Sequence, residues 1–141
     1  MIRFELVTLS GLKFAGDVYE VLLPTMEGEI GVLDGHMPLV SVATHGVVSV
    51  RRNSSDRDDM MESYATNGGV IEVKDNVLRV LVDEADHETD IDETEVQRAI
   101  TEAKRLKSQA KDQVSIEHAQ SLIDRHEVRL QVAGLRRRKR R

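Results

Sequence analysis

The chain of 141 residues contains no cysteine and no tryptophan, and only two phenylalanines, two tyrosines and two prolines. Without cysteine, neither disulfide bonds nor thiol chemistry can contribute to its stability or function. An aromatic content of 3% leaves a core to be built from valine, leucine and isoleucine. It also disfavours the aromatic stacking platforms on which single-stranded nucleic acid binds. We therefore expect an aliphatic core and no base-stacking surface.

Long apolar runs are missing as well. No run approaches the roughly 20 residues that a helix needs to cross a bilayer. The first residues, MIRFELVTLSG, lack the apolar centre of a signal peptide. From these two absences we expect a soluble, cytoplasmic chain.

Charge is distributed unevenly. The formal net charge is −5, yet the last six residues, Arg136–Arg141, are all basic. Six of the 20 basic residues lie there, which leaves 14 in the rest of the chain against 25 acidic ones. An acidic body is a poor general binder of nucleic acid, so contact with a polyanion would have to come from this tail.

Short strand-like segments dominate residues 1–85, and turn residues separate them. Such spacing predicts an antiparallel β-sandwich, because a parallel sheet would need helices between its strands. Asn67-Gly68 and Asp75-Asn76 predict hairpin turns, and the polar stretch Asn53–Asp59 a hairpin tip. The expected strands include Arg3–Thr8, Leu12–Phe14, Val18–Leu23, Gly46–Arg52, Met60–Thr66, Gly69–Val73 and Val77–Val82.

Residues 86–93 are strongly acidic and predict a linker, after which helical spacing begins. Apolar residues three and four apart predict one helix over Thr94–Ala110 and a second one capped by Ser115 and ending near Gly134. The short connection between them predicts an antiparallel hairpin over residues 94–135, followed by the basic tail, 136–141. The fold class is therefore α+β, a sandwich followed by a two-helix hairpin.

The stretch Pro24–Val50 is rich in glycine and holds two histidines, so we weighed it as a chemical site. Its glycines are spaced Gly-x-x-Gly-x-x-x-Gly, which matches neither a dinucleotide-binding nor a Walker loop. An enzyme built on Asp34, His36 and His45 would need a third partner that the sequence does not supply. Turns and close packing explain the glycines better.

This stretch resembles the epsilon subunit of F-type ATP synthases. That family carries a Gly-Glu-x-Gly-x-Leu-Pro-Gly-His-x-Pro-Leu run followed by a Gly-Val strand. The matching residues here are Gly28, Glu29, Gly31, Leu33, Gly35, His36, Pro38, Leu39, Gly46 and Val47. Asp34 stands where the family usually has proline, and both residues favour turns. Asn67–Val73 is similar to a second landmark, a Gly-Gly-x-x-Glu-Val strand.

The resemblance implies a non-catalytic rotor subunit without a cofactor, peripheral at the cytoplasmic face of the cell membrane and attached only through its complex. It implies that the sandwich couples the gamma subunit to the c-ring of a proton-translocating synthase. It implies that the hairpin regulates ATP hydrolysis through the alpha/beta head, with the basic tail meeting an acidic segment of beta. The residues expected at the rotor contacts are Glu29, Gly31, His36, Met37, Pro38 and Leu39.

Two alternatives remain open. Some bacterial epsilon subunits bind ATP through an Ile/Leu-Asp-x-x-Arg-Ala motif, and both Thr94–Ala99 and Ile91–Val96 match it incompletely. The carboxylates nearby would repel a triphosphate. The second alternative is a small adaptor that binds acidic surfaces or RNA through the tail residues Arg136, Arg137, Arg138, Lys139, Arg140 and Arg141.

Overall fold

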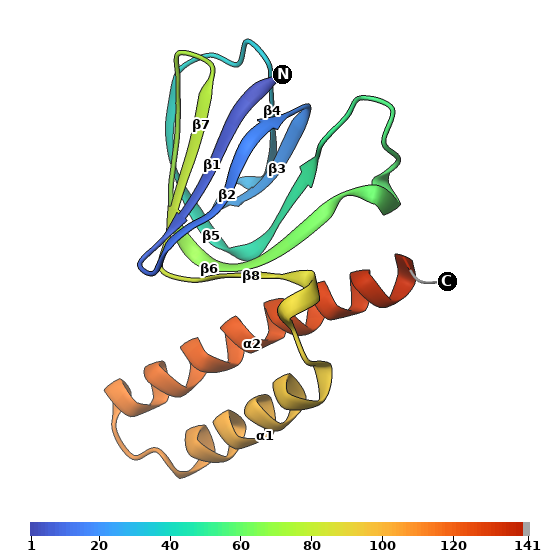
Figure 1. Cartoon of the computed structure of the whole chain (residues 1–141). Helices are drawn as coiled ribbons and strands as arrows, with labels where there is room; N and C mark the ends of the chain where they lie inside the picture. Colours follow the sequence, from blue (N-terminus) through green and yellow to red (C-terminus); the bar gives the residue numbers. More distant parts are fainter. Residues whose placement is uncertain (140–141) are drawn as a thin grey trace.

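A computed structural model describes residues 1–139 and shows a two-layered sandwich of strands resting on two helices (Figure 1). The strand order is β2-β1-β7-β6-β5-β3-β4, with β8 beside β6. All pairs are antiparallel except β1 and β7, which are parallel. The strands are β1 Ile2–Thr8, β2 Gly11–Val18, β3 Glu20–Thr25, β4 Gly28–Leu33, β5 Leu39–Arg51, β6 Glu62–Lys74, β7 Val77–Val82 and β8 Ala85–His87.

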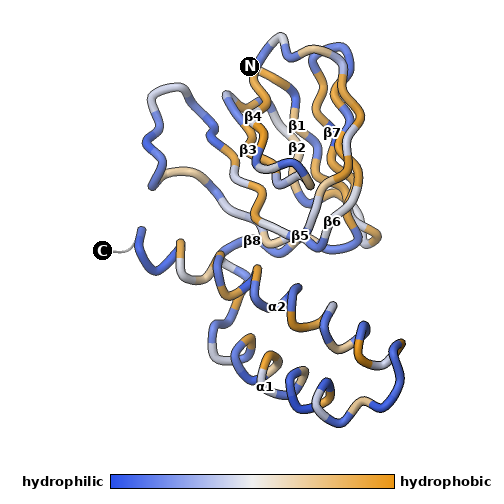
Figure 2. The backbone as a smooth tube through the Cα atoms, turned by 180° about the vertical axis from the view of Figure 1, so that it is seen from behind, coloured by the Kyte–Doolittle hydropathy of each residue, from blue (hydrophilic) through white to orange (hydrophobic). Residues whose placement is uncertain are grey.

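The sandwich core is aliphatic, as its composition predicts. The largest fully buried side chain is Phe4, and the others in that set are isoleucine, leucine and valine. Figure 2 shows the hydrophobic positions gathered along the strands, whereas α1 is largely hydrophilic. Phe14 and Tyr64 complete one end of the core and meet edge to face, with ring centroids 6.5 Å apart.

The prediction of a hairpin turn at Asn67-Gly68 is wrong. Strand β6 runs without interruption through both residues and pairs with β5 along its length. Gly68 has φ +93°, and a Cβ at Gly69 would collide with the backbone of Leu81. Glycines are needed here because the two long strands bend from one layer of the sandwich into the other. Asp75-Asn76 does form the predicted turn, with φ of 51° and 59°.

The acidic stretch 86–93 is structured rather than a free linker. Asp86 and His87 belong to β8, which pairs with Tyr64–Thr66 of β6, and Glu88–Asp90 forms a 3-10 helix. Asp92 then caps α1, Glu93–Gln109, by accepting hydrogen bonds from the amides of Thr94 and Glu95. The sandwich layer thus extends to residue 87.

Both expected ends of the second helix are also wrong. Helix α2 spans Gln113–Lys139, and the side chain that accepts from its first turn is Asp112, whose Oδ1 lies 2.7 Å from the Ser115 amide. Gly134 lies buried inside the helix and does not end it. The helix continues because its far end packs against the sandwich. Arg136–Lys139 are therefore its last turn, and Arg140 and Arg141 lie outside the described residues.

Helix α2 joins the hairpin to the sandwich. One apolar cluster combines Val132 and Ala133 of α2 with Val96 and Ile100 of α1 and with Ala65 of β6. Val132 is completely buried. The helices therefore pack on each other and on the outer face of β6 at the same time, which positions the hairpin beneath the sandwich (Figure 1).

Candidate partner-binding surface

An apolar row crosses five strands on the outer face of one layer. In the register of the sheet, Val7 lies opposite Leu12 and Leu81, Leu81 opposite Val70, and Val70 opposite Val42. Residues opposite each other share a face and lie within contact distance. Leu12 and Val42 are each 58% exposed, and Val70 and Leu81 are exposed too. We call these five residues the apolar row.

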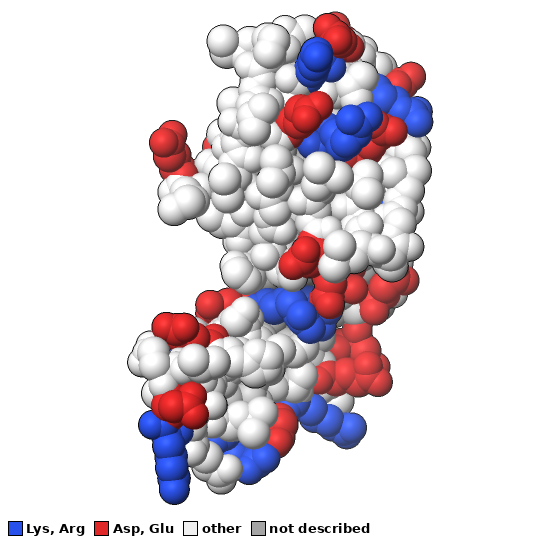
Figure 3. Space-filling view, turned by 90° about the vertical axis from the view of Figure 1, so that its left-hand side faces the viewer, with Lys and Arg blue, Asp and Glu red and all other residues white. Residues whose placement is uncertain are grey.

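The apolar row has a polar margin. Two residues from Val7 and Leu81 along their strands, Glu5 and Arg79 form an ion pair at 3.0 Å. Figure 3 shows a face of the sandwich that is broadly free of charge and bordered by charged groups. A contiguous exposed apolar patch with a polar rim marks an interaction surface.

The six predicted contact residues fall into two separate places. Glu29 and Gly31 lie exposed on β4, near the tip of its hairpin with β3. His36–Leu39 follow the other end of β4, a strand about 16 Å long at ~3.3 Å per residue. Met37 is exposed there, and Leu39 opens β5, the strand that carries Val42 of the apolar row. The second group is thus continuous with the apolar row, and the first forms a tip of its own.

Asn76 anchors the turn that precedes His36. Its side-chain amide donates to Asp34 Oδ1 at 2.8 Å and to the Met1 carbonyl at 3.1 Å, and its Oδ1 accepts from the Gly35 amide at 2.9 Å. The hydrogen bond from Asn76, assisted by the N-terminal charge, holds the pKa of Asp34 below its usual value. Asp34, where the related family usually has proline, fixes this turn by hydrogen bonding.

The chemical alternatives for this stretch find little support in its geometry. His36 Nδ1 lies 2.7 Å from the Met37 carbonyl, and His45 lies on β5 opposite Asn67. The two histidines therefore belong to different segments. Gly28 and Gly35 lie at opposite ends of β4 and form no common loop.

The comparisons with known proteins agree with this architecture. Residues 1–88 match the family model for the ATP synthase delta/epsilon chain, β-sandwich domain. An ATP synthase epsilon chain of Herpetosiphon aurantiacus is 32% identical over 136 residues, which cover 96% of both chains. That of Halalkalibacterium halodurans is 32% identical over 94% of this chain and 97% of its own length.

The chain belongs to the ATP synthase epsilon family.

As an epsilon chain, it is a non-catalytic subunit of the ATP synthase complex. Two solved structures share its fold. One is the Euglena gracilis mitochondrial ATP synthase with OSCP, F1 and c-ring in rotational state 1, where a chain matches with a TM-score of 0.76 and 24% identity, over 90% of this chain and 78% of the other. The other is the central stalk and c-ring of the Tetrahymena thermophila enzyme, with a TM-score of 0.58, 17% identity and 91% coverage of both chains. Within residues 1–139, no helix is both long and apolar enough to cross a membrane.

In this epsilon chain, the hairpin is held to the sandwich by ion pairs. Arg129 of α2 contacts Asp86 at 2.7 Å and Glu84 at 3.2 Å, and Arg125 contacts Glu84 at 3.4 Å. Glu84 and Asp86 thus face α2 and neutralise its arginines.

The last turn of α2 makes contacts of the same kind. Lys139 Nζ lies 2.9 Å from Glu88, and Arg137 lies 2.7 Å from Glu93. Arg136 donates to the Glu88 carbonyl at 3.3 Å. Three of the residues expected to form a free tail therefore bind within the chain.

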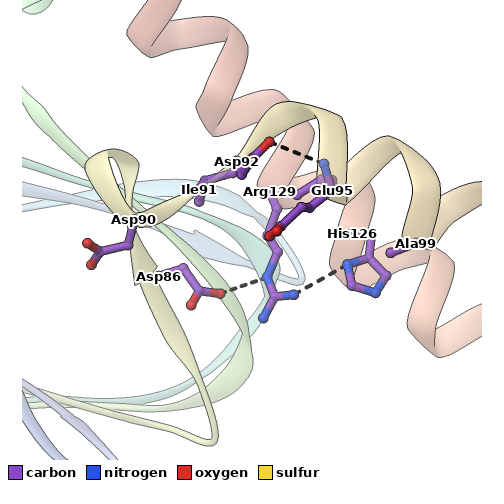
Figure 4. A pocket seen from close by; sticks show the side chains of 9 residues that line it. Asp86, Asp90, Ile91, Asp92, Glu95, Ala99, His126 and Arg129 are labelled. Carbon is purple, nitrogen blue, oxygen red and sulfur yellow. Dashed lines mark hydrogen bonds and ion pairs between the residues drawn. The ribbon is translucent and has the colours of Figure 1, made fainter.

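A cavity of about 310 Å³ lies between the acidic stretch and the two helices (Figure 4). Its ionisable lining consists of Asp86, Asp90, Asp92, Glu95, His126 and Arg129. Arg98, the arginine of the Thr94–Ala99 frame, does not line it, and Arg129 is already paired with Asp86. Four carboxylates against one committed arginine make a poor environment for a triphosphate.

His126 is the titratable group at the centre of this junction. Its ring lies 3.3 Å from the Arg129 guanidinium. Burial lowers the pKa of His126, and the positive charges of Arg129 and Arg125 lower it further, while Glu84 and Asp86 act in the opposite direction. Docking of the hairpin therefore favours the neutral form of the ring.

The apolar row and the anchoring contacts of α2 were not among the expectations from the sequence. Members of the apolar row come from five strands, so only the pairing register brings them together. One signal was present: in Val77–Val82 (VLRVLV), two of the three outward positions, Val77 and Leu81, are apolar, whereas a solvated face favours polar residues. Met26, 79% exposed at the tip of the β3–β4 hairpin, was missed too.

Proposed function

We propose that this epsilon chain is the central-stalk subunit that couples the gamma subunit to the c-ring of a proton-translocating F-type ATP synthase, at the cytoplasmic face of the cell membrane. We further propose that its hairpin regulates ATP hydrolysis. The observation that carries the first proposal is the apolar row with its polar margin. A non-catalytic subunit that turns with a rotor must bind it tightly. Burial of apolar side chains at the interface supplies such binding energy without requiring directional contacts.

The two groups of predicted contact residues suit two different partners. The apolar row and the adjoining Met37–Leu39 fit the gamma subunit, because they offer the larger apolar area. The tip with Met26 and Glu29 is narrow and carries an acidic group, which fits a short polar loop of a c-ring. The two surfaces lie at different parts of the sandwich, so both partners can bind at once.

The hairpin contacts support a regulatory role. Its attachment to the sandwich relies partly on solvent-accessible ion pairs, those of Arg125 and Arg129 with Glu84, each of which contributes about 0–1 kcal/mol. Release of the hairpin is therefore inexpensive, and a partner such as the alpha/beta head can compete for it. The same contacts count against the adaptor alternative, because they occupy Arg136, Arg137 and Lys139 within the chain.

The test is co-purification of tagged chain with its partners from native membranes. Val70→Glu places a charge in the apolar row and should abolish recovery of gamma and, with it, the c-ring. Val114→Glu is the matched control, because Val114 is 77% exposed on α2 and away from the apolar row. If the V70E chain still recovers gamma as well as wild type does, the apolar row is not the gamma contact.

A further inference from the structure

The first part of β5 leaves one side of its backbone without a strand neighbour. Leu39–Val42 pair with β6 on one side, while β3 meets β5 only at Ala43 and then at Ser49–Arg51. Within residues 1–139, no strand pairs with Leu39–Val42 on the side away from β6. These four residues form the free edge of the layer that carries the apolar row.

The register identifies which residues present their backbone at this edge. The Arg3 amide donates to the Asn76 carbonyl at 3.2 Å, so Asn76 faces β1 and its neighbour Val77 faces β6. Alternation carries this pattern across the sheet, since successive residues of a strand direct their N–H and C=O groups to opposite sides. Leu39 lies opposite Val73, and Ser41 opposite Ile71. The backbone N–H and C=O groups of Leu39 and Ser41 therefore face β6. Val40 and Val42 direct their N–H and C=O groups outward.

The same two residues also have exposed side chains. Val40 is 75% exposed, and Val42 is a member of the apolar row. Free backbone groups and uncovered apolar side chains thus coincide at one edge. Pro38, just before them, lacks an N–H and cannot donate to a further neighbour, which sets where an added strand would end.

The opposite edge of this layer is protected, and the free edge is not. Proteins usually guard a sheet edge with charged residues, proline or bulges. Strand β2, at the far edge, carries exposed Lys13 and Asp17, and the pairing of β1 with β2 is irregular between Leu6 and Val7. Leu39–Thr44 contains no charged residue at all. An unguarded edge that adjoins a docking surface is suited to pairing with another chain.

We infer that the Leu39–Val42 edge binds an extended segment of the gamma subunit as an additional strand, by β-augmentation. This inference rests on the proposed function, since the segment belongs to the partner that covers the apolar row. The added strand would hydrogen-bond to Val40 and Val42 and continue the apolar row by one strand. Its side chains on that face must be uncharged and apolar. A second copy of this chain is the competing occupant.

Amide hydrogen exchange tests the inference residue by residue, on the full chain alone and in complex with purified gamma subunit. In the free chain, the amides of Leu39, Ser41 and Ala43 are protected by β6, whereas those of Val40 and Val42 exchange rapidly. In the complex, Val40 and Val42 should exchange at least about tenfold more slowly, as expected for a backbone hydrogen bond.

Every other outcome overturns either the strand addition alone or the proposed function as well. If the methyl signals of Val70 and Leu81 shift while the Val40 and Val42 amides stay unprotected, gamma covers the apolar row without adding a strand, and the inference fails alone. If neither the methyl groups nor the amides respond, the proposed function fails as well. If both amides become protected in the free chain as its concentration rises, the occupant is a second copy, and the inference is wrong.

A pair of substitutions gives an independent measurement. Val40→Pro removes the outward N–H, and a proline is tolerated on an edge strand whose N–H faces away from the sheet. Val40→Ala loses most of the side chain and keeps the N–H. Gamma should bind the V40P chain at least about tenfold more weakly than the V40A chain, with similar melting temperatures for both. Equal affinities would contradict strand addition.

Discussion

At the scale of single residues, the turn between β6 and β7 shows how one side chain organises several segments. Asn76 adopts φ +59°, a region that asparagine tolerates better than most residues, and binds Met1, Asp34 and Gly35. Segments 1, 34–35 and 76 are far apart in sequence, so these bonds fix where the turn before His36 lies. Asn76 is a positioning residue for the proposed gamma contact.

Substitution of Asn76 should separate its backbone role from its hydrogen bonds. Asn76→Gly keeps the left-handed conformation accessible but loses the three bonds, and should cost about 1–2 kcal/mol of unfolding free energy. Asn76→Ala should cost roughly 1–2 kcal/mol more, because alanine disfavours that conformation. Urea unfolding of both variants measures the difference. Equal stability of the two would show that the backbone conformation relaxes at no cost.

For Glu29, the proposed function predicts a role in binding rather than in folding. It is exposed on β4 near the hairpin tip, and surface substitutions usually change stability by within ~0.5 kcal/mol. Glu29→Lys should therefore leave the melting temperature nearly unchanged and weaken binding to the isolated c-ring. Glu127→Lys, an equal charge change at an exposed position of α2, serves as the control. A clear drop in melting temperature for E29K alone would assign Glu29 a structural role instead.

At the scale of elements, α2 carries two faces with different chemistry. Its apolar residues, Val132 and Ala133, pack against Ala65 of the sandwich and Ile100 of α1. Its arginines, Arg125 and Arg129, contact the carboxylates of Glu84 and Asp86. Burial of the apolar part resists salt, and the ion pairs are screened by it. Docking of the hairpin thus has a salt-resistant and a salt-sensitive component.

The docking of α2 should weaken in mild acid because of His126. Its pKa is lowered in the docked state, so the stabilisation is complete above the unfolded value of about 6.5 and is lost as pH falls below it. The charged groups that face the ring are Arg125, Arg129, Glu84 and Asp86, and the carboxylates of Asp90, Asp92 and Glu95 line the same cavity. Hydrogen exchange of the α2 amides should therefore be faster at pH 5.5 than at pH 7.5, after correction for intrinsic rates.

His126→Gln is the variant that isolates this effect. Glutamine keeps a polar side chain of similar size but does not titrate, so the corrected exchange of α2 should become independent of pH between 7.5 and 5.5. A variant that retains the full pH dependence would assign it to another group at the junction.

At the scale of the whole molecule, the proposed function assigns attachment to the sandwich and regulation to the hairpin. Truncation after Asp90 keeps all eight strands and removes both helices. The truncated chain should melt cooperatively and assemble with gamma, because its core and the apolar row are intact. In the reconstituted complex it should raise the rate of ATP hydrolysis, since the proposed regulatory element is absent.

The measurement is ATP hydrolysis by complexes that contain truncated or full-length chain, at low and at high salt. High salt should bring the hydrolysis rate of the full-length complex closer to that of the truncated one. Screening weakens the proposed contacts between the basic residues and the alpha/beta head. Serine in place of all six basic residues, Arg136–Arg141, should give part of the same increase. Equal rates for the truncated and full-length complexes under both conditions would rule out inhibition by the hairpin.

The sequence by itself determined the class of the fold, the two regions and the turn at Asp75-Asn76. These depend on short-range information: alternation of apolar residues, spacing by three and four, and the conformational preferences of asparagine, aspartate and glycine. The residues predicted as partner contacts all lie within the landmark Gly28–Leu39, whose turns are encoded locally as well.

Tertiary structure alone decided the remaining features. Asn67-Gly68 favours a turn by itself, yet the pairing of β6 with β5 before and after Gly68 carries the strand through this bend. Gly134 and the arginines after it favour a helix end, but burial of Val132 and the contacts of Lys139 with Glu88 continue α2 to residue 139. The apolar row and the free edge at Val40 and Val42 exist only through the register, which brings together residues up to 74 positions apart, such as Val7 and Leu81. Local preferences of about 1 kcal/mol or less yield to such contacts, because packing and pairing act over many residues at once.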